Sequence, residues 1–176
     1  MSRAAVMVMG EFFVHLKKNL EGDLEKFVTP LIQKTGDTNK FLREDCHVAL
    51  DQMVENTTPA RAIVVVTTEM MNHKNPVIRA TVARLLAYIT DRLGPQRALS
   101  GTKDVTDKLL PAVAKLAQDS SQEARVYSKM ALRCMMEHPE FDRILKKNVT
   151  ANTMRSLEKI IDALKNPESN GGSARR

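Results

Sequence analysis

The sequence predicts an all-α fold in which pairs of helices stack into a solenoid. Three observations lead to this prediction. The apolar segments have helical spacing, a capping residue stands four positions before an arginine in three places, and small or apolar residues follow each of these arginines at the same distances along the chain. Aromatic residues make up 4% of the chain, Trp is absent and Met is abundant, so we expect an aliphatic core with Met in the irregular gaps. Seven or eight helices and no strand are expected.

The central helix is expected to begin at Pro76. Asn75 offers a side-chain oxygen to the free N–H groups of a first turn, and Pro76 suits the next position because its missing donor would be unpaired there anyway. Gly94-Pro95 should end this helix, so that it reaches about Leu93. Four apolar residues recur at helical spacing along it: Ile78, Val82, Leu85 and Ile89.

The capping residue and arginine of this helix have two counterparts. The three pairs are Asn39 with Arg43, Asn75 with Arg79, and Ser121 with Arg125. Small or apolar residues follow each arginine at the same offsets: Cys46, Ala49, Leu50 and Met53; Val82, Leu85, Leu86 and Ile89; Ser128, Ala131, Leu132 and Met135. The three caps are 36 and 46 residues apart, which brackets the period of roughly 40 to 47 residues expected for two-helix HEAT repeats.

The remaining elements follow from the same pattern. At the N-terminus Arg3 fits the arginine position of a half repeat, with Val6, Met9 and Phe13 at the core offsets. Pro30 and Pro111 should each kink the first helix of a pair. Five further helices are expected. The first opens at residue 22 or 23, the second covers 40–54, and the third runs from behind Thr58-Pro59 to Met71. The fourth covers 103–117, and the fifth runs from loop 119–121 to Met136.

A weaker pair should cap the array, with a short helix at 141–145 and an apolar helix that ends near Leu164. Residues 1–165 are therefore expected to form a HEAT-repeat α-solenoid of about three full helical pairs, an N-terminal half repeat and a C-terminal cap pair. Residues 166–176 are polar and rich in Gly and Ser, so a disordered tail is expected there.

The residue types argue against catalysis. The four histidines have no mutual spacing of three or four, so a helical metal pair is not available, and no Gly-rich phosphate loop or nucleophile elbow occurs. We expect no enzyme, metal site, cofactor or small-molecule substrate. No apolar run approaches the roughly 18 residues of a membrane span. Cys46 and Cys134 fall on the expected core faces, as reduced thiols of a cytosolic protein would.

The charge balance favours an acidic partner, because the formal net charge is +6. Nucleic acid is not expected, since aromatic stacking platforms are absent and basic residues are interleaved with acidic ones. Lys40, Lys74 and Asn75 lie in loops that stacking would align along one edge of the solenoid, which predicts a binding strip. A monomer is expected.

The repeated arginines allow two interpretations. Arg43, Arg79 and Arg125 could bind a partner, or each could pair with an acidic or carbonyl group of a neighbouring loop, where Asp37 and Asp119 are well placed. The planar guanidinium suits a partly buried pair, so we favour the structural role.

Four stretches make the chain resemble the TOG domains of microtubule regulators, particularly those of the crescerin (TOGARAM) family. They are LIQKTGD at 31–37, MVENTTPARA at 53–62, HKNPVIR at 73–79 and LSGTKD at 99–104. The resemblance covers about residues 3–164. Full TOG domains have more HEAT repeats, and their first loop often carries a tryptophan that this chain lacks. The resemblance therefore implies the C-terminal part of a TOG domain or a shortened relative.

The resemblance implies a cytoplasmic, cytoskeletal and ciliary module that binds αβ-tubulin or microtubules through the loops within its repeats. Its implied tubulin-binding residues are Thr38, Asn39, Lys40, His73, Lys74, Asn75, Ser120, Ser121 and Arg125. The alternative that we keep is a HEAT scaffold that binds a protein or peptide on its helical face without affinity for tubulin.

Overall fold

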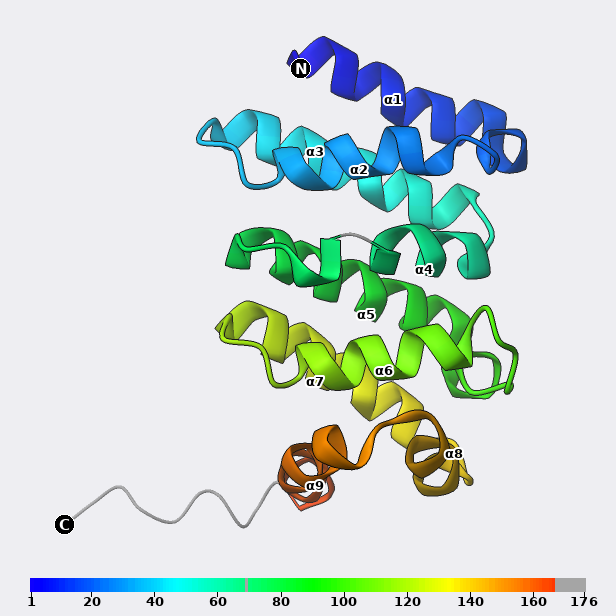
Figure 1. Cartoon of the computed structure of the whole chain (residues 1–176). Helices are drawn as coiled ribbons and strands as arrows, with labels where there is room; N and C mark the ends of the chain where they lie inside the picture. Colours follow the sequence, from blue (N-terminus) through cyan, green and yellow to red (C-terminus); the bar gives the residue numbers. More distant parts are fainter. Residues whose placement is uncertain (69, 167–176) are drawn as a thin grey trace, which may run out of the picture.

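The computed structural model describes residues 1–68 and 70–166, which form stacked helix pairs (Figure 1). Its α-helices are α1 (Arg3–Leu16), α2 (Leu24–Lys34), α3 (Lys40–Asn56), α4 (Pro59–Thr68), α5 (Pro76–Ala98), α6 (Thr106–Leu116), α7 (Gln122–Met136), α8 (Phe141–Asn148) and α9 (Ala151–Lys165). Two short 3₁₀ helices, η1 (Lys17–Leu20) and η2 (Met70–Asn72), precede α2 and α5. Within the described residues there is no strand, as predicted.

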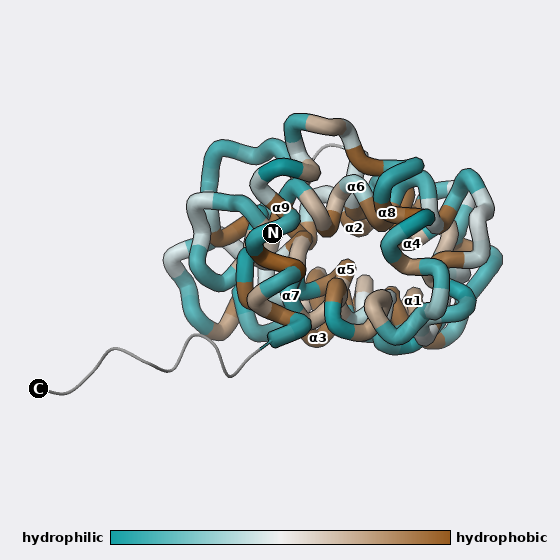
Figure 2. Tube along the Cα trace, turned by 90° about the horizontal axis from the view of Figure 1, so that it is seen from below, coloured by the Kyte–Doolittle hydropathy of each residue, from teal (hydrophilic) through white to brown (hydrophobic). Residues whose placement is uncertain are grey.

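The helices form two layers. Figure 2 shows α1, α3, α5 and α7 on one side and α2, α4 and α6 on the other. The second helix of each pair thus lies in one layer and the first helix in the other. The order of the pairs follows the chain, and α8 and α9 close the C-terminal end (Figure 1). This arrangement is the HEAT-type solenoid that the repeat predicts.

The predicted core register is confirmed. All twelve residues at the shared offsets after Arg43, Arg79 and Arg125 are at most 2% exposed. In the half repeat Val6 and Phe13 are fully buried, and Met9 packs against the core. The arginine offset therefore identifies the inner face of each second helix, because residues three, seven and ten positions on lie on one side of a helix.

Several element boundaries differ from the prediction. Nine α-helices occur in the described part, one or two more than the seven or eight expected. Gly94 breaks α5 at a positive φ of 69°, as expected, but one further helical turn follows it. α6 begins at Thr106 and not at residue 103, since the Thr106 hydroxyl accepts from Gly101 N and donates to Ala98 O and so holds the preceding loop.

The two prolines that were expected to kink a helix lie inside helices that continue past them, Pro30 in α2 and Pro111 in α6. At the C-terminal end Asn166 N donates to Asp162 O, 3.0 Å away, and so closes α9. The rest of the expected disordered tail, residues 167–176, lies outside the described residues. No helix among the described residues is long and apolar enough to cross a membrane.

The cysteines are both free thiols, but only one is a core residue. Burial raises the pKa of Cys46 to about 11, with Asp45 and Asp37 adding to the effect, which keeps this thiol protonated and unreactive. Cys134 was expected in the core and is instead half-buried. Its position lies nine residues after Arg125, at the edge of the buried face.

Contacts between neighbouring second helices are uneven. α5 packs extensively on α7, and α1 on α3, whereas α3 and α5 contact each other much less. α1 approaches α3 so closely that a Cβ on Gly10 would lie 2.2 Å from the Gln52 side-chain oxygen. The array therefore contains two closely packed helix pairs in this layer.

The contact between α3 and α5 is also polar. Arg84 Nη1 lies 2.8 Å from Asp51 Oδ1, and the Tyr88 hydroxyl donates to Glu55 at 2.6 Å. Beside them Arg84 Nε and His47 Nδ1 are buried without a hydrogen-bond partner in the described part of the chain. Burial and the neighbouring Arg84 guanidinium lower the pKa of His47, so that this imidazole stays neutral near pH 7.

Candidate functional site

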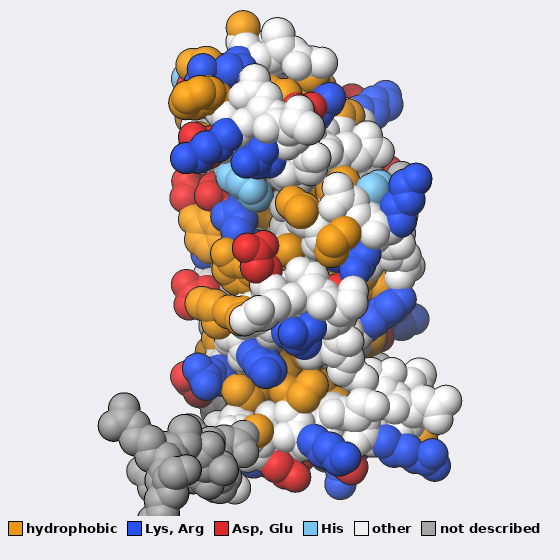
Figure 3. Space-filling model, turned by 90° about the vertical axis from the view of Figure 1, so that its left-hand side faces the viewer, with side chains coloured by type: hydrophobic (Ala, Val, Ile, Leu, Met, Phe, Trp, Pro, Cys, Tyr) orange, Lys and Arg blue, Asp and Glu red, His pale blue; other side chains and the backbone are white. Residues whose placement is uncertain are grey.

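Three loops within the repeats lie one above another along one edge of the array. They join α2 to α3, η2 to α5 and α6 to α7, and Figure 1 shows them on the left. Figure 3 faces this edge and shows Lys and Arg side chains gathered along it, with apolar and His side chains between them. The predicted alignment of the loops is therefore present in the fold.

Each loop is built from a trio of residues that ends in the helix cap. In the first trio Asp37 Oδ1 accepts from Asn39 N at 3.0 Å, and Asn39 Oδ1 accepts from two N–H groups of α3. The second and third trios repeat these bonds: His73 Nδ1 with Asn75 N at 3.1 Å, and Asp119 Oδ1 with Ser121 N at 2.8 Å. Asn75 and Ser121 cap α5 and α7 in the same way.

The repeated arginines donate hydrogen bonds to the backbone of the loops. Nη1 of Arg43 donates to the carbonyl oxygens of Asp37 and Thr38, at 2.8 and 3.0 Å. Arg79 and Arg125 donate in the same way to the first two carbonyls of their own trios. These bonds satisfy loop carbonyls that no helix partner could reach, so the arginines shape the loops.

Among the three arginines, Arg79 alone is seen to bond to the next loop within the described part of the chain. Its Nε and Nη2 donate to the two carboxylate oxygens of Asp119 at 2.7 and 3.0 Å, and Nη2 donates to Ser120 Oγ at 2.9 Å. The two side chains of the ion pair are 14% and 13% exposed. Burial alone would raise the pKa of Asp119, but hydrogen bonds from Arg79 and from the Ser121 N–H lower it below its ordinary value.

Of the expected pairs between an arginine and a neighbouring loop, the described residues therefore show one, Arg79 with Asp119. Asp37 offers its backbone carbonyl to Arg43 in its own repeat, while its carboxylate accepts from Lys34 at 2.9 Å. The first trio position of the middle repeat explains why Arg43 has no such partner, since His73 stands there where the other two trios have Asp37 and Asp119.

The residues at the loop tips face solvent. The middle members of the three trios, Thr38, Lys74 and Ser120, are all exposed, with their carbonyls turned towards the arginines. The structure aligns Lys74 with Thr38, whereas Lys40 aligns with Pro76 and lies 3.6 Å from Glu44 in an exposed ion pair. Lys40 and Lys74 thus lie on the same edge but at different positions in the repeat.

The other predicted site residues divide into two groups. Asn39 is exposed, and four residues are half-buried because their polar atoms are used within the loops: His73, Asn75, Ser121 and Arg125. Sequence reasoning missed Phe41 and Val77, which stand two residues after the caps Asn39 and Asn75 and are 60% and 44% exposed. A large apolar residue in the first turn, off the apolar stripe, was the pattern that could have identified them.

The described residues contain no cluster of His, Cys, Asp or Glu that could hold a metal ion. The edge instead offers cations, hydroxyls, amides and two exposed apolar side chains. Such a surface can bind another macromolecule by complementary charge and by apolar contact.

Comparisons with known proteins place this chain in a family. The sequence model described as CLASP N terminal matches residues 1–165. The chain is 42% identical over 164 residues to the TOG array regulator of axonemal microtubules protein 1 of Mus musculus, covering 93% of this chain and 9% of that protein. It is 27% identical over 172 residues to the Crescerin-like protein che-12 of Caenorhabditis elegans, covering 97% of this chain and 13% of that protein. The chain thus spans about a tenth of the length of these relatives.

A solved structure described by the words "TOG-tubulin binding specificity promotes microtubule dynamics and mitotic spindle formation" has the same fold. The two structures align with a TM-score of 0.59 and 14% sequence identity, over 92% of this chain and 62% of the other. At this level of identity the likeness concerns the arrangement of the helices.

Proposed function

Since this chain belongs to the CLASP N-terminal family, whose members include TOG-like domains, we propose that it is a non-catalytic module that binds tubulin or microtubules. The names of the relatives, one of which regulates axonemal microtubules, support this proposal, as does the similarity to a structure that concerns TOG–tubulin binding. The same relatives support a place in the cytoskeleton, at ciliary microtubules. Residues 1–165 would act as one unit and as a monomer.

The observation that carries the proposal is the row of three internally bonded loops on one edge. Rigid loops reduce the conformational entropy that is lost on binding, so they favour a surface that is formed before the partner arrives. We assign the contacts to exposed residues: Thr38, Lys40, Lys74 and Ser120, with Phe41 and Val77 beside them. Asn39, His73, Asn75, Ser121 and Arg125 would support these contacts by fixing the loop backbone.

Reversing the charge of Lys74 is expected to weaken tubulin binding without affecting the fold. Lys74 is exposed and forms no ion pair within the described residues, so Lys74→Glu should change the free energy of unfolding by less than about 0.5 kcal/mol. Against an acidic partner the change replaces attraction with repulsion, and we expect about threefold to tenfold weaker binding. Titration with unpolymerised tubulin and a thermal melt measure the two effects.

The matched control is Lys103→Glu, which makes the same change at an exposed lysine on the opposite edge. It should leave binding unchanged. The double variant Lys40→Glu/Lys74→Glu should lose more than Lys74→Glu alone, and binding by the unaltered chain should fall as salt rises. If the unaltered chain binds tubulin and the double variant binds equally well, the loop edge is not the interface. If the unaltered chain does not bind, the tubulin proposal itself is wrong.

A further inference from the structure

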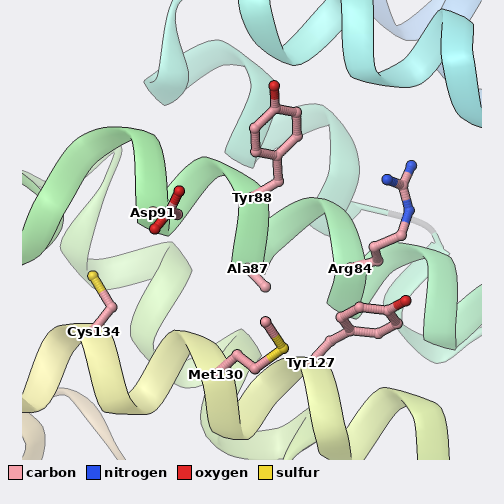
Figure 4. A pocket seen from close by; sticks show the side chains of 7 residues that line it. All are labelled: Arg84, Ala87, Tyr88, Asp91, Tyr127, Met130 and Cys134. Atoms are coloured by element: carbon pink, nitrogen blue, oxygen red, sulfur yellow. The ribbon is translucent and has the colours of Figure 1, made fainter.

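A second surface lies on the helix layer formed by α1, α3, α5 and α7. An open pocket of about 360 Å³ lies there on the surface between α5 and α7 (Figure 4). Ala87 and Met130 face each other at its centre, Arg84 and Tyr127 stand at one end, and Asp91 and Cys134 stand at the other (Figure 4). The pocket is thus apolar in the middle and carries charged residues at its two ends.

The apolar part of this surface is more exposed than the core pattern requires. Met130 is 54% exposed and Val126, one turn earlier on α7, is 50% exposed. Neither residue belongs to the buried stripe of α7. Methionine adapts its shape to varied partners because its side chain is unbranched, and neighbouring exposed apolar residues are typical of interaction surfaces.

The same pocket recurs in the other closely packed helix pair. The α7 lining residues Tyr127, Met130 and Cys134 stand two, five and nine positions after Arg125. A smaller pocket between α1 and α3 is lined by the α3 residues at the same offsets from Arg43: Asp45, Val48 and Gln52. Val48, the counterpart of Met130, is 59% exposed. A pocket thus occurs at the same place in both closely packed helix pairs.

The charges at the two ends of the α5–α7 pocket are not equivalent. Arg84 is already paired with Asp51 on α3, and its guanidinium points away from Met130 (Figure 4). Asp91 and Glu137 are exposed, and neither side-chain carboxylate has a hydrogen-bond or ion-pair partner among the described residues. Both carboxylates lie near Cys134, since they raise the pKa of its thiol further after burial has raised it. The end of the pocket at Asp91 and Cys134 is therefore negative.

We propose that this pocket docks a segment of a partner protein that presents a large apolar side chain close to a lysine or arginine. The apolar side chain would lie between Ala87 and Met130, and the cation would reach the unpaired carboxylate of Asp91. This surface belongs to the helix layer and not to the loop edge, so the proposal does not rest on tubulin binding.

Synthetic peptides test this docking site directly. The probes are twelve-residue Gly/Ser peptides that carry one Leu and one Arg, separated by zero to three residues, and matching peptides with Glu in place of Arg. Titration into ¹⁵N-labelled chain, followed by NMR, should shift the amide resonances around Ala87 and Met130. At the best spacing the Arg peptide is expected to bind about threefold to fivefold more tightly than the Glu peptide.

Two variants and a control locate the binding. Met130→Lys places a charge in the apolar centre and should reduce binding more than about tenfold. Asp91→Asn should remove the preference for Arg over Glu, whereas Asp107→Asn, at an exposed aspartate on α6, should keep it. Both changed residues are exposed, so the thermal melt should stay constant and tubulin binding should be unaffected.

Three outcomes would overturn the proposal. Equal binding of the Arg and Glu peptides would show that the site selects no cation. Shifts confined to other helices would place the peptides elsewhere. Shifts of the same resonances on raising the chain concentration, with no peptide present, would assign the pocket to self-association.

Discussion

Leu85→Ala is expected to lower the free energy of unfolding by about 2 to 5 kcal/mol. Leu85 is fully buried at the centre of α5, where neighbouring helices surround it. Truncation removes apolar contacts and leaves a cavity that a closely packed interior fills only partly. Urea unfolding followed by circular dichroism measures the loss, provided that the slope of the transition is unchanged.

Leu16→Ala is the matched control, since it removes the same atoms from a leucine that is 41% exposed at the end of α1. Leu16→Ala should lower the free energy of unfolding much less than Leu85→Ala does. A loss of under about 0.5 kcal/mol for Leu85→Ala would contradict the assignment of the apolar stripe to the core.

Arg79→Ala is expected to cost about 3 kcal/mol, because it leaves the mostly buried Asp119 carboxylate without its cation and frees two loop carbonyls. The matched control is Arg43→Ala. Arg43 makes the same two carbonyl bonds but, within residues 1–68 and 70–166, pairs with no carboxylate of a neighbouring loop. The difference between the two variants therefore isolates the contribution of the bond between adjacent repeats, and equal losses would show that the pair adds nothing.

The stability that the pair of Arg79 and Asp119 contributes should also depend on pH. The folded-state pKa of Asp119 is lowered, so its stabilising contribution is fully present above the unfolded value of about 4 and is lost as pH falls through the folded pKa. The stability difference between the unaltered chain and Arg79→Ala should shrink below about pH 4. Unfolding curves at pH 7 and at pH 3 measure this change.

The sequence was sufficient for the parts of the fold that depend on local chemistry. Caps such as Asn75 and the offsets after each arginine are set within one helix, so they could be counted along the chain. The bidentate bond between Arg79 and Asp119 could be suspected from the spacing, but its absence at Arg43 depends on which residue the neighbouring loop presents there. The half-burial of Cys134 depends on where α5 packs against α7, which no local pattern encodes.

The candidate site was predictable as a set of loops but not as a set of contacts. The tip residues Lys74 and Ser120 could be placed on an edge because repeats stack in register. Which polar atoms stay available was not predictable, since His73, Asn75 and Ser121 use theirs inside the loops. The exposure of Phe41 and Val77 was not predicted, because it depends on which way the first turns of α3 and α5 face once the repeats are stacked.

Because α3 and α5 contact each other little, we expect the array to bend most easily between these two helices, each of which belongs to a closely packed pair. Among the described residues, buried polar atoms without a hydrogen-bond partner also lie at this contact. On one side of this contact Arg79 and Asp119 clamp the second and third loops together. The first loop lies on the other side, next to the hydroxyl bond of 2.9 Å that joins Thr35 to Thr81. We therefore expect the curvature of the loop edge to change mainly at this point, so that the first loop shifts against the other two, which move together.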